Sequence, residues 1–152
     1  MKRFFLILAI TLGVSFSFAQ EKEERKSTDI NEIEVWTKGV QVSAKGDTAT
    51  VELYLQSYLK NPREFKLNTF STGLLSGSEK PLWYHTMQLG KVLVRLEDRQ
   101  NYLRYLLTRN EPVVLTIKTG DWKKQWGKPK QLKLAFEDFQ EEGKILEFVI
   151  DL

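Results

Sequence analysis

Alternation of apolar and polar residues with a period of two is the feature that most constrains the fold of this chain. From Ala49 to Leu55 every second residue is apolar, and the residues between them are mostly polar. Successive side chains of a β-strand point to opposite faces, so this pattern predicts a strand with one buried face. Similar alternation occurs at 40–44, 91–96, 112–117, 132–136 and 146–152, and weaker strands are expected at 33–36, 65–70 and 83–88.

The segment 98–109 allows two interpretations. As a strand it would bury Leu103 and Leu107 on one face, whereas a helix would bring Tyr102 and Leu106 together. Periodicity alone does not assign so short a run. We prefer the strand because the surrounding sequence is rich in strand patterns, and a helix near 98–109 would make the fold α+β.

About eight or nine short strands at even spacing, without regular alternation of strands and helices, predict an all-β antiparallel sandwich. A small β-barrel is the other all-β alternative. Turn-forming residues separate the predicted strands, among them Gly46 with Asp47, Asn61 with Pro62, and the segment 141–144. We therefore expect one domain that extends over residues 30–152.

Three runs of the sequence carry a resemblance to a known family. They are VELYLQSYLKNPREFKL (51–67), LEDRQNYLRYLL (96–107) and KQLKLAFED (130–138). The first is a strand followed by an Asn-Pro bend, and the second is an acidic turn that leads into a strand containing tyrosines. In this order the chain resembles immunoglobulin-like accessory domains of secreted bacterial proteins. The resemblance implies a domain that binds or braces another molecule without catalysis, and it transfers no functional residue.

The first nineteen residues, 1–19, have the three-part order of a signal peptide. Lys2 and Arg3 precede an apolar run, and Ser17 and Ala19 supply the small residues that a signal peptidase requires. The run is short for a membrane-spanning helix, which needs about 20 apolar residues. We therefore expect cleavage after Ala19, export to the periplasm or the medium, and no stable membrane span in the mature protein.

Residues 20–29 are almost wholly polar or charged, so we expect a disordered leader before the domain. Loss of Lys2 and Arg3 with the signal lowers the formal net charge from +3 to +1. A nearly neutral exported protein lacks the broad basic surface that nucleic acid requires, so no nucleic-acid partner is expected.

The chain has no cysteine, which excludes disulfides and cysteine metal sites.

Several catalytic classes find no support in the sequence. His85 is the only histidine, no G-x-S-x-G motif is present, and phosphate-binding glycine motifs are absent. No metal or cofactor is expected. A hydrolase with two carboxylates is a less favoured possibility, since Glu97-Asp98 and Glu137-Asp138 are adjacent pairs. Neighbours in a strand face opposite sides, so neither pair is predicted to act as a unit, and we expect no enzymatic activity.

The segment GDWKKQWGKPK, residues 120–130, is the strongest candidate for a binding site. Residues 118–133 hold six lysines and one aspartate, whereas the segment 134–152 is strongly acidic. One interpretation is a solvated hairpin whose lysines protect strand edges. The other is a recognition loop with exposed rings and charges, enlarged by the segment 83–85 if the two lie together. The candidate ligand-binding residues are Trp122, Lys123, Lys124, Trp126, Lys128, Trp83 and Tyr84.

Two classes of function follow from these patterns. The first is an exported, non-catalytic β-sandwich that binds a protein or an envelope polysaccharide through its end loops. The second is a small β-barrel that holds a small ligand. The segment WTKG at 36–39 is similar to the Trp-bearing start of lipocalin-like barrels, but those barrels have Gly two residues before the Trp, where this chain has Glu34.

Overall fold

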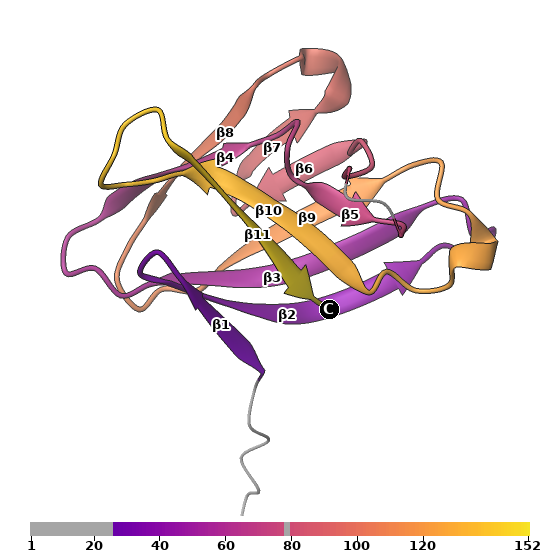
Figure 1. The fold of residues 1–152 in the computed structure, drawn as a ribbon, viewed down its shortest axis with the longest axis horizontal. Coiled ribbons are helices and arrows are strands. Elements are labelled where there is room, and N and C mark those ends of the chain that lie inside the picture. The colour runs from indigo at the N-terminus through magenta and orange to yellow at the C-terminus, as the bar shows by residue number, and fades with distance from the viewer. Residues whose placement is uncertain (1–25, 78–79) are drawn as a thin grey trace, which may run out of the picture.

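The computed structural model describes residues 26–77 and 80–152, which form two antiparallel β-sheets packed face to face (Figure 1). The predicted all-β class and the antiparallel sandwich are thereby confirmed. The immunoglobulin-like topology stays a prediction. The signal peptide 1–19 and residues 20–25 of the expected leader lie outside the described residues.

Two sheets of different size make up the sandwich. The larger sheet contains, in spatial order, β1 (Ser27–Ile30), β2 (Ile33–Val42), β3 (Ala49–Ser57), β9 (Val113–Thr119), β6 (Thr86–Leu89) and β7 (Val92–Arg95). The smaller sheet contains β11 (Ile145–Asp151), β10 (Gln131–Glu137), β4 (Arg63–Asn68) and β8 (Tyr102–Leu107), and β5 (Gly73–Leu75) also pairs with β10. Two 3₁₀ turns, η1 (Leu96–Asp98) and η2 (Lys124–Trp126), are the only helical pieces of the described chain, and neither approaches the length of a membrane-spanning helix.

The hydrophobic core lies between the inner faces of the two sheets. On β3, every second residue from Ala49 to Ser57 is buried and the residues between them are half-buried, as the alternation predicts. Leu53, in the middle of this strand, is 0% exposed and lies opposite Leu115 of β9. The smaller sheet contributes the ring of Phe65, whose centroid lies 5.0 Å from that of Phe136. Burial of apolar surface from both sheets is the main term that stabilises such a fold.

The preferred strand in the ambiguous segment is confirmed by β8, which runs antiparallel to β4 from Tyr102 to Leu107. Leu103 and Leu107 point into the core and are buried, while Leu106 points outward and is exposed. Residues 102–107 therefore form a strand and not a helix, because as a strand they bury one face in the sandwich and pair with β4. Only the three residues of η1 form a helical turn before it.

The expected disordered leader needs a correction at its C-terminal end. Ser27 to Asp29 belong to β1, which pairs antiparallel with β2 across the turn at Asn31 and Glu32. These β1 residues are exposed apart from Ile30, so they bury little apolar surface and their composition gave no sign of order. Backbone pairing with β2 orders them instead, and Ile30 anchors the strand in the core.

One edge of β10 is shared by two short strands with a turn between them. β4 pairs with β10 at Phe136, and β5 pairs with its other half from Gln131 to Lys133. Ala135 of β10 lies between the residues that pair with β4 and those that pair with β5. The hydroxyl of buried Thr72 accepts a hydrogen bond from Ala135 N (3.0 Å) and donates one to Ala135 O (3.1 Å). The Thr72 side chain thus satisfies both backbone groups that a continuous neighbouring strand would otherwise pair.

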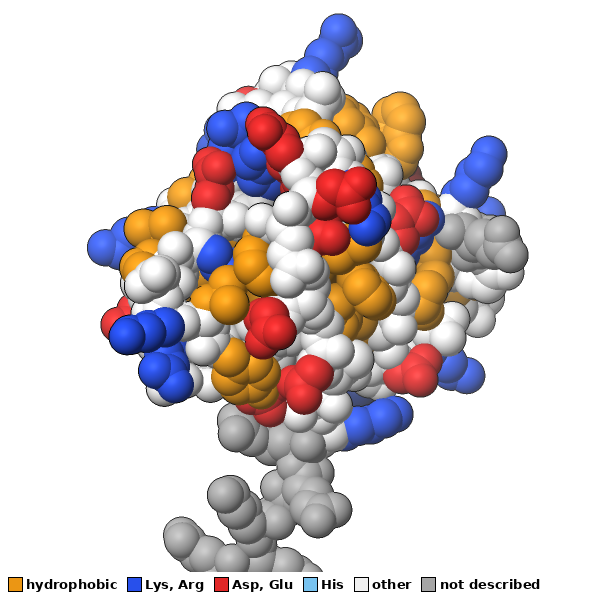
Figure 2. Space-filling model, turned by 60° about the vertical axis from the view of Figure 1, so that its left-hand side comes forward, with side chains coloured by type: hydrophobic (Ala, Val, Ile, Leu, Met, Phe, Trp, Pro, Cys, Tyr) orange, Lys and Arg blue, Asp and Glu red, His pale blue; other side chains and the backbone are white. Residues whose placement is uncertain are grey.

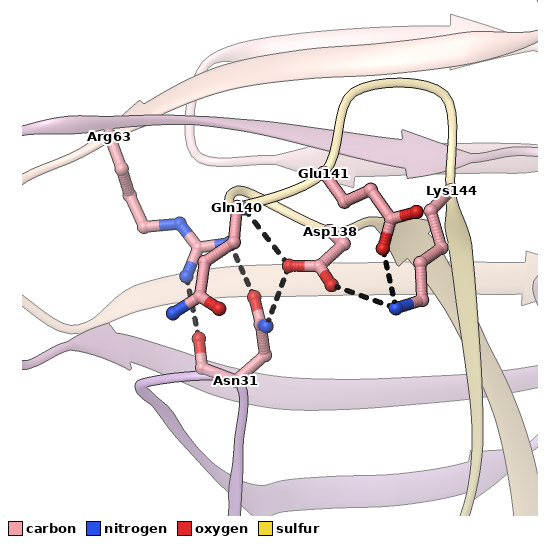
Figure 3. A network of polar contacts seen from close by, with 6 residues as sticks. All are labelled: Asn31, Arg63, Asp138, Gln140, Glu141 and Lys144. Atoms are coloured by element: carbon pink, nitrogen blue, oxygen red, sulfur yellow. Dashed lines mark hydrogen bonds and ion pairs between the residues drawn. The ribbon is translucent and has the colours of Figure 1, made fainter.

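A polar cluster connects the two sheets at the end where β10 turns into β11 (Figure 3). Arg63, at the start of β4, donates through Nη1 to Asn31 O (2.6 Å) and through Nη2 to Asn31 Oδ1 (3.1 Å). Asn31 Nδ2 in turn donates to Asp138 Oδ1 (3.1 Å), whose other oxygen lies 3.7 Å from Lys144 Nζ. Asn31 lies in the β1–β2 turn, so these bonds join the larger sheet to the smaller one.

The environment of this cluster lowers the pKa values of Arg63 and Asp138 and raises that of Lys144, mainly through its hydrogen bond to Glu141. Burial lowers the pKa of Arg63 to about 10, and the nearby Asp138 carboxylate opposes this shift. The pKa of Asp138 is lowered, mainly because the backbone N of Gln140 donates a hydrogen bond to it. A lowered folded-state pKa means that Asp138 stabilises the fold above its unfolded pKa, and that this contribution is lost as the pH falls through the folded value.

Candidate functional site

The first candidate segment, 120–130, connects β9 to β10 and is folded around Trp122. The Trp122 side chain is 4% exposed and belongs to the hydrophobic core. Its Nε1 donates to Gly127 O (2.9 Å), and its backbone N donates to Asp47 O (3.0 Å) in the β2–β3 turn. The exposed ring that a recognition role requires is therefore not present at Trp122, which packs as a core residue of this connection.

The other predicted residues of the segment are arranged around that buried ring. Trp126 is half-buried and meets Trp122 edge to face, with ring centroids 5.1 Å apart. Lys123 is exposed, and its Nζ lies 5.3 Å from the Trp126 ring centroid. Lys124 packs closely on the β2–β3 turn, since a Cβ added to Gly46 would lie 2.6 Å from Lys124 Cβ. These contacts are the kind that hold a connection in place.

Lys128 and Trp126 line an open cavity of about 430 Å³ beside the end of β5.

The basic segment also lies next to acidic β11, as the solvated-hairpin interpretation expects. Lys133 Nζ is 2.7 Å from Glu147 Oε2, and Gln131 donates to Asp151 Oδ1 (3.1 Å). Part of the charge that is separated along the sequence is thus paired across neighbouring strands.

The second candidate segment, residues 83–85, precedes β6 and divides between core and surface. Tyr84 is 1% exposed, and its ring centroid lies 6.5 Å from that of Phe70. Trp83, its neighbour in sequence, is 69% exposed. Trp83 and Trp126 line different cavities, so the structure does not bring the two candidate segments into one binding surface.

Trp83 lines a groove of about 950 Å³ that the sequence analysis did not identify. The groove lies next to η1, the short coil at the top of Figure 1. Side chains from three connections form it. They are Phe70 after β4, Trp83 and His85 before β6, and, from the end of β7 to the start of β8, Arg95, Leu96, Glu97, Arg99 and Asn101.

Backbone hydrogen bonds hold these three connections together. Thr69 N donates to Asn101 O (3.0 Å), which joins the β4–β5 turn to the β7–β8 connection. Leu96 N donates to His85 O (3.2 Å), and His85 N donates to Lys118 O (2.6 Å) at the end of β9. The loops around the groove are therefore fixed by their main chains, which leaves the exposed side chains available to a ligand.

The groove contains two guanidinium groups, Arg95 and Arg99, with one carboxylate, Glu97. Among the described residues neither guanidinium lies within ion-pair distance of a carboxylate. The outer face of the smaller sheet differs, because Lys66 pairs there with Glu137 at 3.0 Å. That pairing raises the pKa of Lys66 and lowers that of Glu137. Figure 2 likewise shows positive and negative side chains interspersed over the face in view.

Arg99 occupies a backbone conformation that suits glycine better than arginine. Its φ is +49°, in the left-handed region, and its N donates to Leu96 O (3.2 Å) at the end of η1. This conformation costs an L-residue with a side chain about 1–2 kcal/mol. Arg99 therefore presents a guanidinium to the groove at a position where Gly would relieve backbone strain.

Of the residues that line this groove, the sequence named only Trp83 as a candidate ligand-binding residue, although the candidate segment 83–85 also contains His85. Arg95, Arg99 and Phe70 gave no signal, because Phe70 lies in a different connection from the two arginines and only the tertiary fold brings them together. No group of three side chains suited to hold a metal ion occurs among residues 26–77 and 80–152. Comparison with protein-family models, with curated proteins and with solved structures gave no match, so the groove is interpreted from its own chemistry.

Proposed function

We propose that this protein is an exported, non-catalytic binding module, and that the groove at Trp83 holds a protein or an envelope polymer. The N-terminal segment 1–19 supports export, since its charged start, apolar run and small residues match a cleavable signal. The groove supports binding, because rigid connections at one end of a sandwich are a common place for recognition.

The exposed ring of Trp83 is the observation that carries this proposal. A tryptophan that is 69% exposed contributes little to the core, yet it lines a groove together with a second exposed ring, Phe70. Tryptophan is enriched among the residues that dominate binding energy at interfaces, where a partner removes the ring from water. The lining also contains Glu97 as its single carboxylate, whereas hydrolysis by a carboxylate pair needs two acids.

Replacement of Trp83 by alanine tests the binding role. Affinity capture from the cell-envelope extract of the producing organism should fall at least about tenfold, because a desolvated anchor contributes roughly 2 kcal/mol or more. The melting temperature should stay unchanged, since the ring is exposed. Leu106→Ala is the matched control, because Leu106 is 59% exposed on the smaller sheet, away from the groove. Equal capture by the Trp83→Ala variant and the wild type would contradict the proposal.

Export is tested separately by N-terminal sequencing of the protein recovered outside the cytoplasm. The mature chain should begin at Gln20, because Ser17 and Ala19 occupy the −3 and −1 positions of the predicted cleavage site. Recovery of an intact chain that starts at Met1 from the periplasm or the medium would show that cleavage does not occur.

A further inference from the structure

The groove at Trp83 combines exposed rings with two guanidinium groups that form no ion pair with a described carboxylate. Two acids lie nearby, since Glu97 also lines the groove and Asp98 Oδ2 accepts a hydrogen bond from Arg95 N (2.8 Å). Trp83 and Phe70 supply the rings, while Arg95 and Arg99 supply the guanidinium groups. An aromatic ring packs well against the apolar C–H face of a sugar, and a guanidinium binds a carboxylate or sulfate through two parallel hydrogen bonds. We infer, on the basis of the proposed function, that the ligand of this groove is an anionic polysaccharide.

Positive charge continues from the groove onto the outer face of the larger sheet. Arg95 of β7 lies opposite Thr86 of β6, and Thr86 lies opposite Lys118 of β9. Adjacent strands are about 4.8 Å apart, so the backbones at Arg95 and Lys118 are separated by roughly 10 Å. Both side chains are exposed and point to the same face. A polymer with repeated acidic groups could contact both cations, which a single small anion could not.

An acidic peptide fits the groove less well than an acidic sugar chain. Peptides gain much of their affinity in extended grooves from backbone hydrogen bonds. In this groove the carbonyls of His85 and Asn101 already accept bonds from neighbouring connections. Two backbone acceptors of the groove are thus already engaged, and the amide of Asn101 beside the rings and guanidinium groups suits the hydroxyls and charges of a sugar acid.

Titration of the full mature protein with defined polymers tests this inference. The probes are polygalacturonate with its methyl ester, and dextran sulfate with neutral dextran. At least one anionic polymer should bind with an affinity that decreases as salt rises, and its uncharged counterpart should bind at least about tenfold more weakly. Poly-glutamate serves as the acidic-peptide probe. Failure of both anionic polymers, or tighter binding of poly-glutamate, would overturn the inference.

Arg99→Gly is the sharpest variant, because it separates binding from stability. Affinity for the anionic polymer should fall at least about fivefold, since a charge-assisted hydrogen bond is lost. The melting temperature should be equal or higher, because Gly relieves the left-handed backbone conformation. Arg104→Gln, on the outer face of the smaller sheet, is the control and should leave binding unchanged. Equal losses for the two variants would indicate diffuse attraction and refute a specific groove.

The two proposals fail in different ways. If capture from the envelope extract depends on Trp83 but no anionic polymer binds, the binding module stands and the polysaccharide inference is wrong. If Trp83→Ala leaves capture from the extract and binding of the anionic polymers unchanged, the groove is not the binding site and both proposals are wrong.

Discussion

Replacement of Trp122 by alanine is expected to lower the free energy of unfolding by about 3–5 kcal/mol, the usual cost of truncating a buried aromatic residue. The ring is 4% exposed, packs in the core and donates a hydrogen bond to Gly127 O. Its loss would leave a cavity and remove the hydrogen bond that ties the ring to Gly127 in the 120–130 connection. Denaturant unfolding followed by fluorescence or circular dichroism measures the change.

Two comparisons make the Trp122 result decisive. Trp126→Ala should cost less, because Trp126 is only half-buried. Exchange of Lys123 and Lys124 for Gln should alter stability very little, since exposed charges contribute little. A Trp122→Ala variant with wild-type stability but without partner capture would instead restore the recognition-loop interpretation of this segment.

Substitution of Thr72 by valine should cost about 2–6 kcal/mol, because it leaves two buried backbone groups of Ala135 without partners. Each unsatisfied buried group costs about 1–3 kcal/mol. Valine has nearly the shape of threonine and lacks only the hydroxyl that bonds to Ala135 N and Ala135 O. The effect therefore reports the hydrogen bonds and not the packing, and equilibrium unfolding in urea measures it.

Thr72→Ser is the matched control for this prediction. Serine keeps the hydroxyl and loses one methyl group, so its cost should be about 1 kcal/mol. If valine proved as stable as serine or better, the backbone of Ala135 would have to find other partners. The role assigned to Thr72 in bridging the gap between β4 and β5 would then be incorrect.

The sandwich was predictable because its main signal is local. The alternation from Ala49 to Leu55 predicts which face of this strand is buried, and in the structure that face of β3 is buried. At 102–107 alternation alone did not assign the strand, and the strand-rich context favoured it; the structure buries Leu103 and Leu107 there. Alternation failed at Ser27 to Asp29, because those residues are ordered by backbone pairing with β2 and their side chains carry no pattern.

The candidate site was less predictable because exposure and proximity are tertiary properties. Trp122 and Trp83 both lie in polar, turn-rich sequence, yet one is buried and the other exposed. The sequence shows that both residues are tryptophans in polar surroundings. It does not show which of the two rings is covered by a neighbouring turn. Arg99 lies far from Trp83 along the chain, and the pairing of β6 with β7 and β9 brings their connections together.

The way the groove is held has a consequence for how this protein can evolve. Its connections are joined by main-chain bonds, such as those from Thr69 N to Asn101 O and from Leu96 N to His85 O. Any residue except proline at the donor positions supplies the same bonds. Mutations at exposed groove positions such as Trp83 and Arg99 therefore leave the scaffold intact. For the proposed binding role, this means that substitutions at these positions can change the ligand preference of the groove while the sandwich stays the same.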